Sequence, residues 1–260
     1  MKNLLFILVF LLLGVAPSFS ADLDTIIRRG KLIVAVKNNL PPLAFLDSQG
    51  NLQGLEIDIA KRLASEILGS DSAIILKPVS NQERLQVVID DRVDLAIARV
   101  AITPARQRLV DFSPFYYLDS SGFVTKNPQL QRLEDLANSR IAVLNGSTTI
   151  ALVRSNLPNA ILRGVASYQE ALNLLETGEI DAFAADNSLL TGWVQQFPNY
   201  RQLPIELGAI ALGVVLPKGL QYQSLRERVN QAIERLESSG WLVERVNYWG
   251  LPLRIREMGR

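Results

Sequence analysis

The stretch VDLAIARV, residues 93–100, decides the fold class of this chain, because it completes a repeating pattern of apolar strands and amphipathic helices. A short apolar run without alternation is typical of a strand that is covered on both faces. Residues 32–36 (LIVAV) and 73–77 have the same character, and residues 55–68 and 83–89 between the strands show helical periodicity. The order strand–helix–strand–helix–strand predicts an α/β fold, in which helices cover a mostly parallel sheet.

The same pattern restarts in the second half of the chain. Strands are predicted over residues 141–144, 161–164, 182–185 and 209–216, and helices over residues 133–137, 149–155, 168–176, 225–236 and 241–249. No Pro- or Ser-rich linker separates the two units, and the segments near residues 117–124 and 207–213 are apolar and strand-like. We therefore expect two α/β units that are joined by paired strand crossings rather than by a flexible tether.

The first 20 residues have the composition of a secretory signal peptide. Lys2 precedes the apolar run LLFILVFLLL (residues 4–13), and small residues follow, with Ser18 and Ser20 before Ala21. This arrangement predicts export and cleavage after Ser20. The alternative is an uncleaved membrane anchor, but the run is only about half of the ~20 apolar residues that span a bilayer. No Cys follows the signal, which excludes a bacterial lipoprotein.

The composition excludes several classes of function. The chain has 260 residues, no Cys, no His and a formal net charge of +1. Without Cys and His there is no disulfide, iron–sulfur cluster, thiolate nucleophile, Ser-His-Asp triad or ordinary zinc site. Any bound metal would have to be a hard cation held by oxygen atoms, and we expect neither a metal nor a cofactor. The balance of 27 basic and 26 acidic residues also argues against nucleic-acid binding.

A series of short motifs along the mature chain carries a family resemblance. In chain order they are GKLIV (30–34), PPL (41–43), GLEIDIA (54–60), VDLA (93–96), ITPAR (102–106), DFS (111–113) with Tyr116 and Tyr117, LEDL (133–136), NGST (145–148), GEIDA (178–182) and WG (249–250). In this order they resemble the periplasmic solute-binding proteins of polar amino-acid ABC transporters. The resemblance implies a two-lobed periplasmic binding protein of type II, in which each lobe is a mostly parallel sheet flanked by helices and the ligand lies in the cleft between the lobes. We expect lobe 1 to comprise residues 21–118 and 208–260, and lobe 2 to comprise residues 119–207.

The resemblance also implies which residues hold the backbone of an amino-acid ligand. Arg106 would clamp the α-carboxylate, and Asp186 would hold the α-ammonium. The loop Gly146, Ser147 and Thr148 would bind the carboxylate at a helix N-terminus, a natural anion site, and Ala101 would contribute its backbone N–H. The alternatives are that Arg106 forms a surface ion pair and that Asp186 is only a helix N-cap.

The side-chain specificity is predicted from the charges in the same motifs. Lys37 stands where relatives that bind basic amino acids carry an acid, so a cationic ligand is disfavoured there. Arg84, close to Asn81, and Tyr168 stand where glutamate- and aspartate-binding relatives carry side-chain contacts. These residues favour an acidic amino acid, unless Lys37 and Arg84 are ordinary solvated rim charges.

Arg99 is a further cation, at a position where small residues are usual in the family. It follows an apolar strand and either points into the cleft or pairs with Asp94 or Asp91. If it fills the cleft, we expect a ligand that is smaller or more anionic than glutamate.

The resulting prediction is a periplasmic, monomeric binding component of an ABC importer for polar amino acids, most of all glutamate or aspartate. It would trap its ligand by hinge closure, catalyse nothing and deliver the ligand to permease subunits on other chains. Three alternatives remain open: a neutral polar ligand such as glutamine, an amino-acid sensor, and a cyclohexadienyl-type dehydratase on the same fold. The dehydratase would need a general acid, for which Glu56 and Asp58 are the candidates.

Overall fold

The computed structural model of the chain describes residues 22–253. The expected signal peptide, with its cleavage after Ser20, lies outside these residues. Within the described part of the chain, no helix combines the length and the apolar character needed to cross a membrane.

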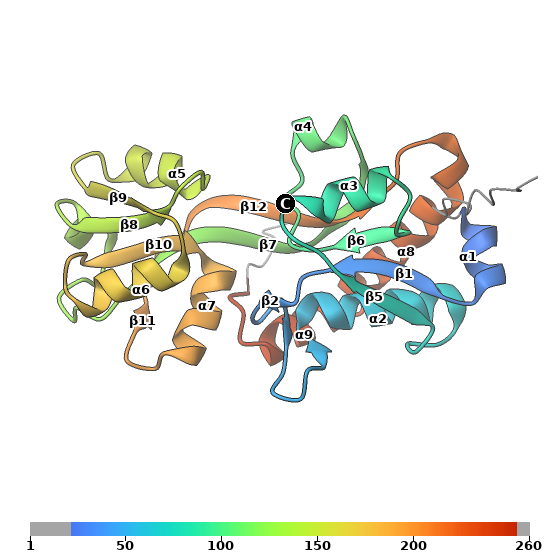
Figure 1. Cartoon of the computed structure of the whole chain (residues 1–260), viewed down its shortest axis with the longest axis horizontal. Helices are drawn as coiled ribbons and strands as arrows, with labels where there is room; N and C mark the ends of the chain where they lie inside the picture. The colour runs from blue at the N-terminus through green and yellow to red at the C-terminus, as the bar shows by residue number, and fades with distance from the viewer. Residues whose placement is uncertain (1–21, 254–260) are drawn as a thin grey trace, which may run out of the picture.

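One long sheet runs through the described residues in the strand order β5-β1-β6-β12-β7-β10-β8-β9, and β11 pairs with β7 (Figure 1). The bounds are β1 (Leu32–Val36), β5 (Ile74–Pro78), β6 (Leu95–Ile97), β7 (Asp111–Thr125), β8 (Arg140–Leu144), β9 (Ile161–Val165), β10 (Ala182–Asp186), β11 (Arg201–Gln202) and β12 (Leu207–Leu216). β5, β1 and β6 are parallel to one another, and so are β10, β8 and β9. A separate small antiparallel sheet consists of β2 (Asn39–Leu40), β3 (Ala44–Leu46) and β4 (Leu52–Gln53).

Helices cover both faces of the two parallel parts of the sheet. Their bounds are α1 (Leu23–Arg29), α2 (Leu55–Leu68), α3 (Glu83–Ile89), α4 (Pro104–Gln107), α5 (Thr149–Asn156), α6 (Tyr168–Glu176), α7 (Asn187–Gln196), α8 (Gln223–Ser238) and α9 (Trp241–Tyr248), with 3-10 turns η1 (Leu133–Leu136) and η2 (Leu220–Tyr222). In the first part, α2, α8 and α9 share one buried cluster with the sheet, and α3 belongs to a cluster on the other face. In the second part, α5 lies in one cluster, and α6 and α7 lie in the other. The predicted α/β fold class is therefore confirmed.

The two parts are joined through the long antiparallel strands β7 and β12. β7 pairs with β12 on one side and with β10 on the other, while β12 also pairs with β6. Figure 1 shows these two strands running from one half of the molecule into the other. We keep the names lobe 1 for residues 22–118 and 208–253 and lobe 2 for residues 119–207, and this division remains our proposal.

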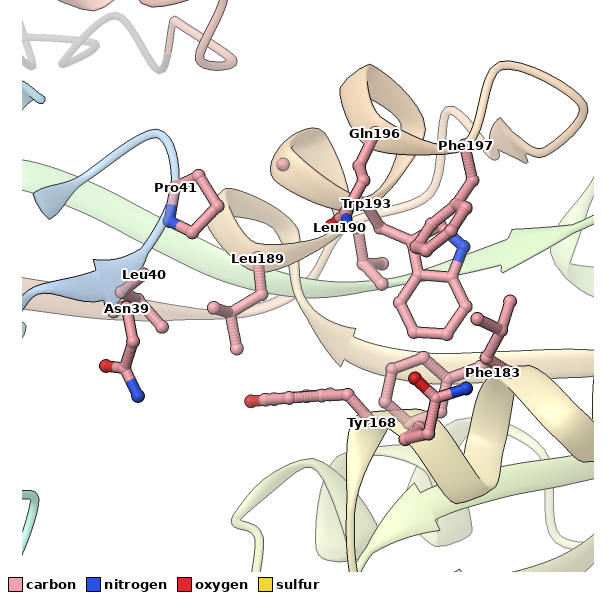
Figure 2. A pocket seen from close by; sticks show the side chains of 13 residues that line it. Asn39, Leu40, Pro41, Tyr168, Phe183, Leu189, Leu190, Trp193, Gln196 and Phe197 are labelled. Carbon is pink, nitrogen blue, oxygen red and sulfur yellow. The ribbon is translucent and has the colours of Figure 1, made fainter. Parts of the chain in front are cut away.

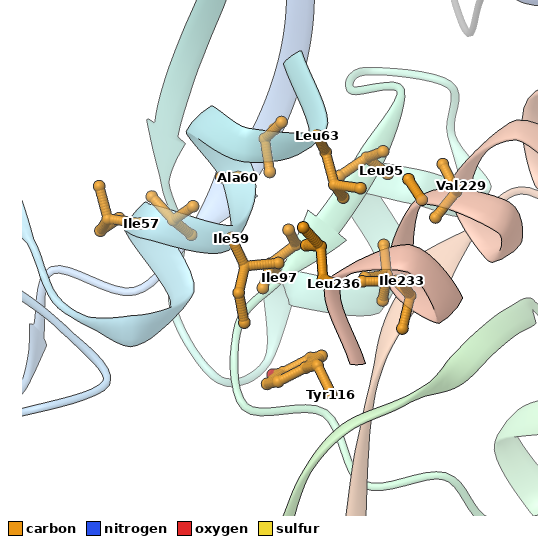
Figure 3. Packing of buried hydrophobic residues seen from close by; sticks show 14 of the residues in the cluster. Ile57, Ile59, Ala60, Leu63, Leu95, Ile97, Tyr116, Val229, Ile233 and Leu236 are labelled. Carbon is orange, nitrogen blue, oxygen red and sulfur yellow. The ribbon is translucent and has the colours of Figure 1, made fainter. Parts of the chain in front are cut away.

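Helix α2 shows how the sequence forms the core of lobe 1. Ile59 and Leu63 lie four positions apart, which places them on one face of the helix, and both are fully buried. Figure 3 shows this face packed against Leu95 of β6 and Ile233 of α8. The helix ends because Gly69 adopts a left-handed conformation with φ 79°, from which its N–H bonds to the Ser65 carbonyl.

The predicted strand over residues 93–100 is wrong at its C-terminal end. β6 stops at Ile97, and Arg99 has φ 50°, in the left-handed region. The N–H of Arg99 donates to the side chain of Glu56 instead of to a neighbouring strand, so the strand is interrupted there, and pairing with β12 resumes only as an isolated bridge between Ala101 and Leu212. The helices predicted over residues 55–68, 83–89 and 168–176 are confirmed with the same bounds, whereas α4 and α7 were not expected.

The core packing of α2 predicts a large loss of stability on truncation. Leu63→Ala should lower the free energy of unfolding by about 2–5 kcal/mol, because it leaves a cavity among fully buried neighbours. Lys61→Ala, an exposed position on the same helix, is the matched control and should change it by less than about 0.5 kcal/mol. Urea unfolding followed by circular dichroism measures both, and equal losses would contradict the assigned core.

Candidate functional site

An ion pair between Arg99 and Asp186 joins the two lobes at the predicted ligand position. Asp186 is the last residue of β10 in lobe 2, and Arg99 follows β6 in lobe 1. The Nη2 of Arg99 also lies 3.9 Å from Oδ2 of Asp119 on β7. Asp186 occupies the N-cap position of α7, but its side chain makes no capping hydrogen bond there. Its carboxylate therefore serves the contact between the lobes rather than the helix.

Pairing of Arg99 with Asp94 or Asp91, one of the two alternatives for this residue, does not occur. Asp94 is ion-paired with Arg29 and accepts a hydrogen bond from the N–H of Ile33, at 2.7 Å. Asp91 accepts from the hydroxyl of Tyr222, at 3.1 Å. The side chain of Arg99 instead reaches Asp186 of lobe 2.

Arg106 lies in the short helix α4, which begins at Pro104 after the N-cap Thr103. Its Nη1 donates to the carbonyl oxygen of Ala101 at 2.9 Å, so the two predicted ligand contacts are adjacent. Burial lowers the pKa of Arg106, and the charge of Arg99 lowers it further. The guanidinium groups of Arg106 and Arg99 are therefore close enough to repel each other.

The loop that precedes α5 connects to the same place from lobe 2. Gly146 has φ 72°, and the Ser147 hydroxyl accepts from the N–H of Thr149 at 3.1 Å. The Thr149 hydroxyl lies 3.0 Å from that of Ser121, which donates to Oδ1 of Asp186 at 3.5 Å. Thr148 is exposed at the helix start. The start of α5 and the carboxylate of Asp186 are thus brought together, and sequence reasoning missed Ser121 and Thr149 as the link.

Lys37 is not a solvated rim charge, because its side chain is only 5% exposed. Its Nζ donates to the carbonyl oxygen of Val79 at 2.8 Å. Burial lowers the pKa of Lys37, and the charge of Arg84 adds to the effect. Asn81 is exposed and lines an open depression with Lys37, next to the small sheet of lobe 1.

Arg84 braces the turn that carries Arg99. Its Nη1 donates to the carbonyl oxygens of Ala98 at 2.9 Å and of Arg99 at 2.6 Å. Burial, followed by the charges of Arg106 and Arg99, lowers the pKa of Arg84 to about 10. Lobe 1 therefore gathers Arg84, Arg99 and Arg106 within one small region.

A buried carboxylate, Glu56, lies beneath this region, and we had not assigned it a binding role. Its Oε1 accepts from the N–H of Arg99 at 2.6 Å and from the hydroxyl of Tyr116 at 2.5 Å. Burial raises the pKa of Glu56 above its ordinary value of 4.5, although both hydrogen bonds oppose that rise. Glu56 falls on the apolar stripe of α2, four positions before Ala60. An acidic residue at such a position indicates, from the sequence, a carboxyl group that is buried and hydrogen-bonded.

An apolar pocket lies between the two lobes. It has a volume of about 200 Å³ and is lined by the segment Asn39–Leu40–Pro41 of lobe 1 and by residues of α6, β10 and α7, with Tyr168, Phe183 and Trp193 as its aromatic members. Figure 2 shows the Tyr168 side chain directed toward the lobe 1 segment. Burial raises the pKa of Tyr168, and the charge of Arg99 opposes that rise.

The approach of the lobes depends on a missing side chain at this pocket. A Cβ at Gly192 of α7 would lie 2.2 Å from the carbonyl oxygen of Pro41. Any larger residue would push the backbone of lobe 1 away from α7. Gly192 thus lets the two lobes meet at the pocket as well as at the ion pair.

The chain is similar to known proteins of one family. A sequence model described as "Bacterial extracellular solute-binding proteins, family 3" matches residues 32–252. The chain is 36% identical over 184 residues to the glutamine-binding protein of Geobacillus stearothermophilus, covering 70% of each chain. It is 29% identical over 204 residues to the ABC transporter glutamine-binding protein GlnH of Bacillus subtilis, covering 78% of this chain and 74% of that protein.

The chain is also similar to a solved structure. The solute receptors for L-cysteine of Neisseria gonorrhoeae match with a TM-score of 0.70 and 28% identity, over 88% of this chain and 93% of that one. The family resemblance inferred from the motifs is confirmed by these comparisons.

The burial of Glu56 predicts how the stability of the folded protein changes with pH. Because its pKa is raised on folding, the folded protein holds a proton that the unfolded chain releases above about pH 4.5, so wild-type stability falls as pH rises beyond that point. Glu56→Gln lacks this titration. The free energy of unfolding of the variant should therefore rise relative to wild type between about pH 4.5 and 7, by at most about 1.4 kcal/mol per pH unit.

Urea midpoints at a series of pH values measure this difference. Asp24→Asn, at an exposed carboxylate of α1, is the control and should run parallel to wild type. If the stability of Glu56→Gln changed with pH in parallel with that of wild type, Glu56 would not titrate above its ordinary range.

Proposed function

This chain belongs to family 3 of the bacterial extracellular solute-binding proteins, and we propose from that premise that it is the binding component of an ABC importer for polar amino acids. It acts outside the cytoplasmic membrane, in the periplasm, after cleavage of its signal peptide. It acts as a monomer, binds and releases its ligand unchanged, and presents it to permease subunits on other chains.

The observation that carries the proposal is the meeting of opposite charges across the lobes. Arg106 on lobe 1 donates to the carbonyl oxygen of Ala101, two residues after Arg99, and Arg99 is ion-paired with Asp186 on lobe 2. A guanidinium on one side and a carboxylate on the other match the carboxylate and ammonium of a zwitterionic amino acid. A ligand that bridges the two groups stabilises the closed arrangement of the lobes.

The excess of cations favours an acidic side chain. Lys37 and Arg84 supply positive charge on lobe 1 in addition to Arg106, and Glu56 lies beneath them with its charge disfavoured by burial. Aspartate or glutamate offers a second carboxylate to these groups. A basic ligand would meet like charge, which lowers its affinity.

Glutamine is the second candidate ligand. Two relatives of the chain, at 36% and 29% identity, are named as glutamine-binding proteins. The amide oxygen of glutamine accepts hydrogen bonds from the same guanidinium groups, without the full charge attraction of a carboxylate.

The dehydratase alternative lacks a suitably placed acid among the two candidates. Glu56 is fully buried beneath Arg99 and has no exposed surface from which to reach a leaving group. Asp58 accepts from the indole N–H of Trp249 at 2.8 Å and lies 3.7 Å from Arg245. A sensor that presents the bound ligand to a receptor would use the same binding site as the transporter.

Isothermal titration with L-glutamate, L-aspartate, L-glutamine, L-arginine and L-histidine tests the ligand class. We expect the acidic amino acids to bind most tightly, with glutamine next and the basic amino acids at least about tenfold weaker than both. Tight binding of arginine or histidine, with no binding of the other three, would overturn the specificity that we propose.

The role of Arg106 is tested by Arg106→Ala. Loss of a charge-assisted contact to the α-carboxylate should weaken the tightest ligand of the panel by about 100-fold. Arg108→Ala removes an exposed guanidinium two residues away and should leave the affinity unchanged. Equal affinities for the two variants would remove Arg106 from the site.

A further inference from the structure

The backbone at Arg99 is held in an unusual conformation that directs its side chain toward lobe 2. A φ of 50° is in the left-handed region, which residues with a side chain rarely adopt. The N–H of Arg99 donates to buried Glu56, and its carbonyl oxygen accepts from Arg84. Both backbone groups are thus fixed by the side chains of Glu56 and Arg84, so the strain is retained at this residue by specific contacts.

The Arg99 side chain is bound to the Asp186 carboxylate, which the ammonium group of the proposed ligand needs. Its Nη2 is ion-paired with Oδ2 of Asp186, while Oδ1 of Asp186 receives the weaker contact from Ser121. Asp119 offers no replacement for the ligand, because its two oxygens accept from the N–H of Ser188 at 3.1 Å and from its hydroxyl at 2.5 Å.

The contact of Arg99 with Asp186 is of a kind that another cation can displace. It is made through one nitrogen rather than as a two-pronged contact, and the buried Nε of Arg99 has no hydrogen-bond partner among the described residues. The side chain is also 19% exposed, which leaves water access to the pair. An incoming ammonium would therefore compete with a single charge-assisted hydrogen bond.

We propose that Arg99 is a specificity-determining residue, which competes with the α-ammonium of the ligand for Asp186 and holds the lobes together when no ligand is bound. The inference rests on the proposed function, because it assumes that an amino acid binds between Arg106 and Asp186. An amino acid must displace Arg99, whereas a carboxylate without an ammonium need not. Arg99 therefore reduces the preference for amino acids over their analogues that lack the amino group.

Affinity measurements with matched probes test the competition. Arg99→Gly removes the guanidinium and suits the left-handed backbone. L-Glutamate and L-glutamine should bind this variant at least about tenfold more tightly than wild type, while glutarate, which lacks the ammonium, should bind no more tightly. Asp91→Gly, at the other non-glycine position with positive φ, controls for relief of backbone strain and should leave all three affinities unchanged. Equal or weaker amino-acid binding by Arg99→Gly would overturn the competition.

A distance measurement tests the contact between the lobes without any ligand. Because the chain has no Cys, spin labels attach only at Ser155→Cys on α5 and Gln231→Cys on α8, both exposed. Electron–electron double resonance should give a longer or broader distance distribution for Arg99→Gly than for the labelled protein with Arg99. Identical distributions would overturn the role of Arg99 in holding the lobes together.

The two experiments separate this inference from the proposed function. If neither protein binds any amino acid of the panel, the proposed function and the competition both fail, and the distance measurement still decides the contact. If amino acids bind wild type and Arg99→Gly equally, the proposed function stands and the competition fails.

Discussion

The pairing of β7 with β12 is the constraint on which the rest of the structure depends. These strands are the centre of the sheet and carry the polypeptide between its two parallel parts. Asp119 lies on β7 at this crossing, fully buried, and its oxygens accept from the backbone and hydroxyl of Ser188 at the start of α7. The strand pair therefore fixes where α7 begins, and with it the position of Asp186 relative to lobe 1.

Burial changes the electrostatics of the charged residues at the cleft. Glu56 lies under the turn that carries Arg99, and its burial disfavours the negative charge that the neighbouring cations favour. Arg84 is bound to carbonyl oxygens of the same turn. The side chains of Glu56 and Arg84 therefore hold the strained backbone at Arg99 from two sides. The result is a rigid lobe 1 surface with several guanidinium groups, which faces a lobe 2 carboxylate. A binding protein that moves by hinge closure needs such fixed surfaces, because only the separation between them should change.

Local patterns predicted most elements of this fold. The apolar stripe of α2, with glycine after its last turn, gave the correct bounds, and α3 and α6 followed from the same periodicity. The strand through Arg99 was wrong because its end depends on a hydrogen bond to Glu56, which is 43 positions away in the sequence. α7 was missed because the polar residues Asn187, Ser188 and Thr191 are buried in it, so its sequence does not show a continuous apolar stripe.

The sequence by itself determined the α/β class, the family and the identity of the charged residues, because periodicity, motif order and residue type are local properties. Only the tertiary structure decided what those charges contact. Lys37 is buried on a carbonyl oxygen, Arg84 supports a turn, and Arg99 crosses to Asp186 rather than pairing with Asp94 or Asp91. The physical reason is that the partner of a flexible, charged side chain depends on distance and on desolvation in three dimensions. Neither quantity follows from the position of the residue along the chain.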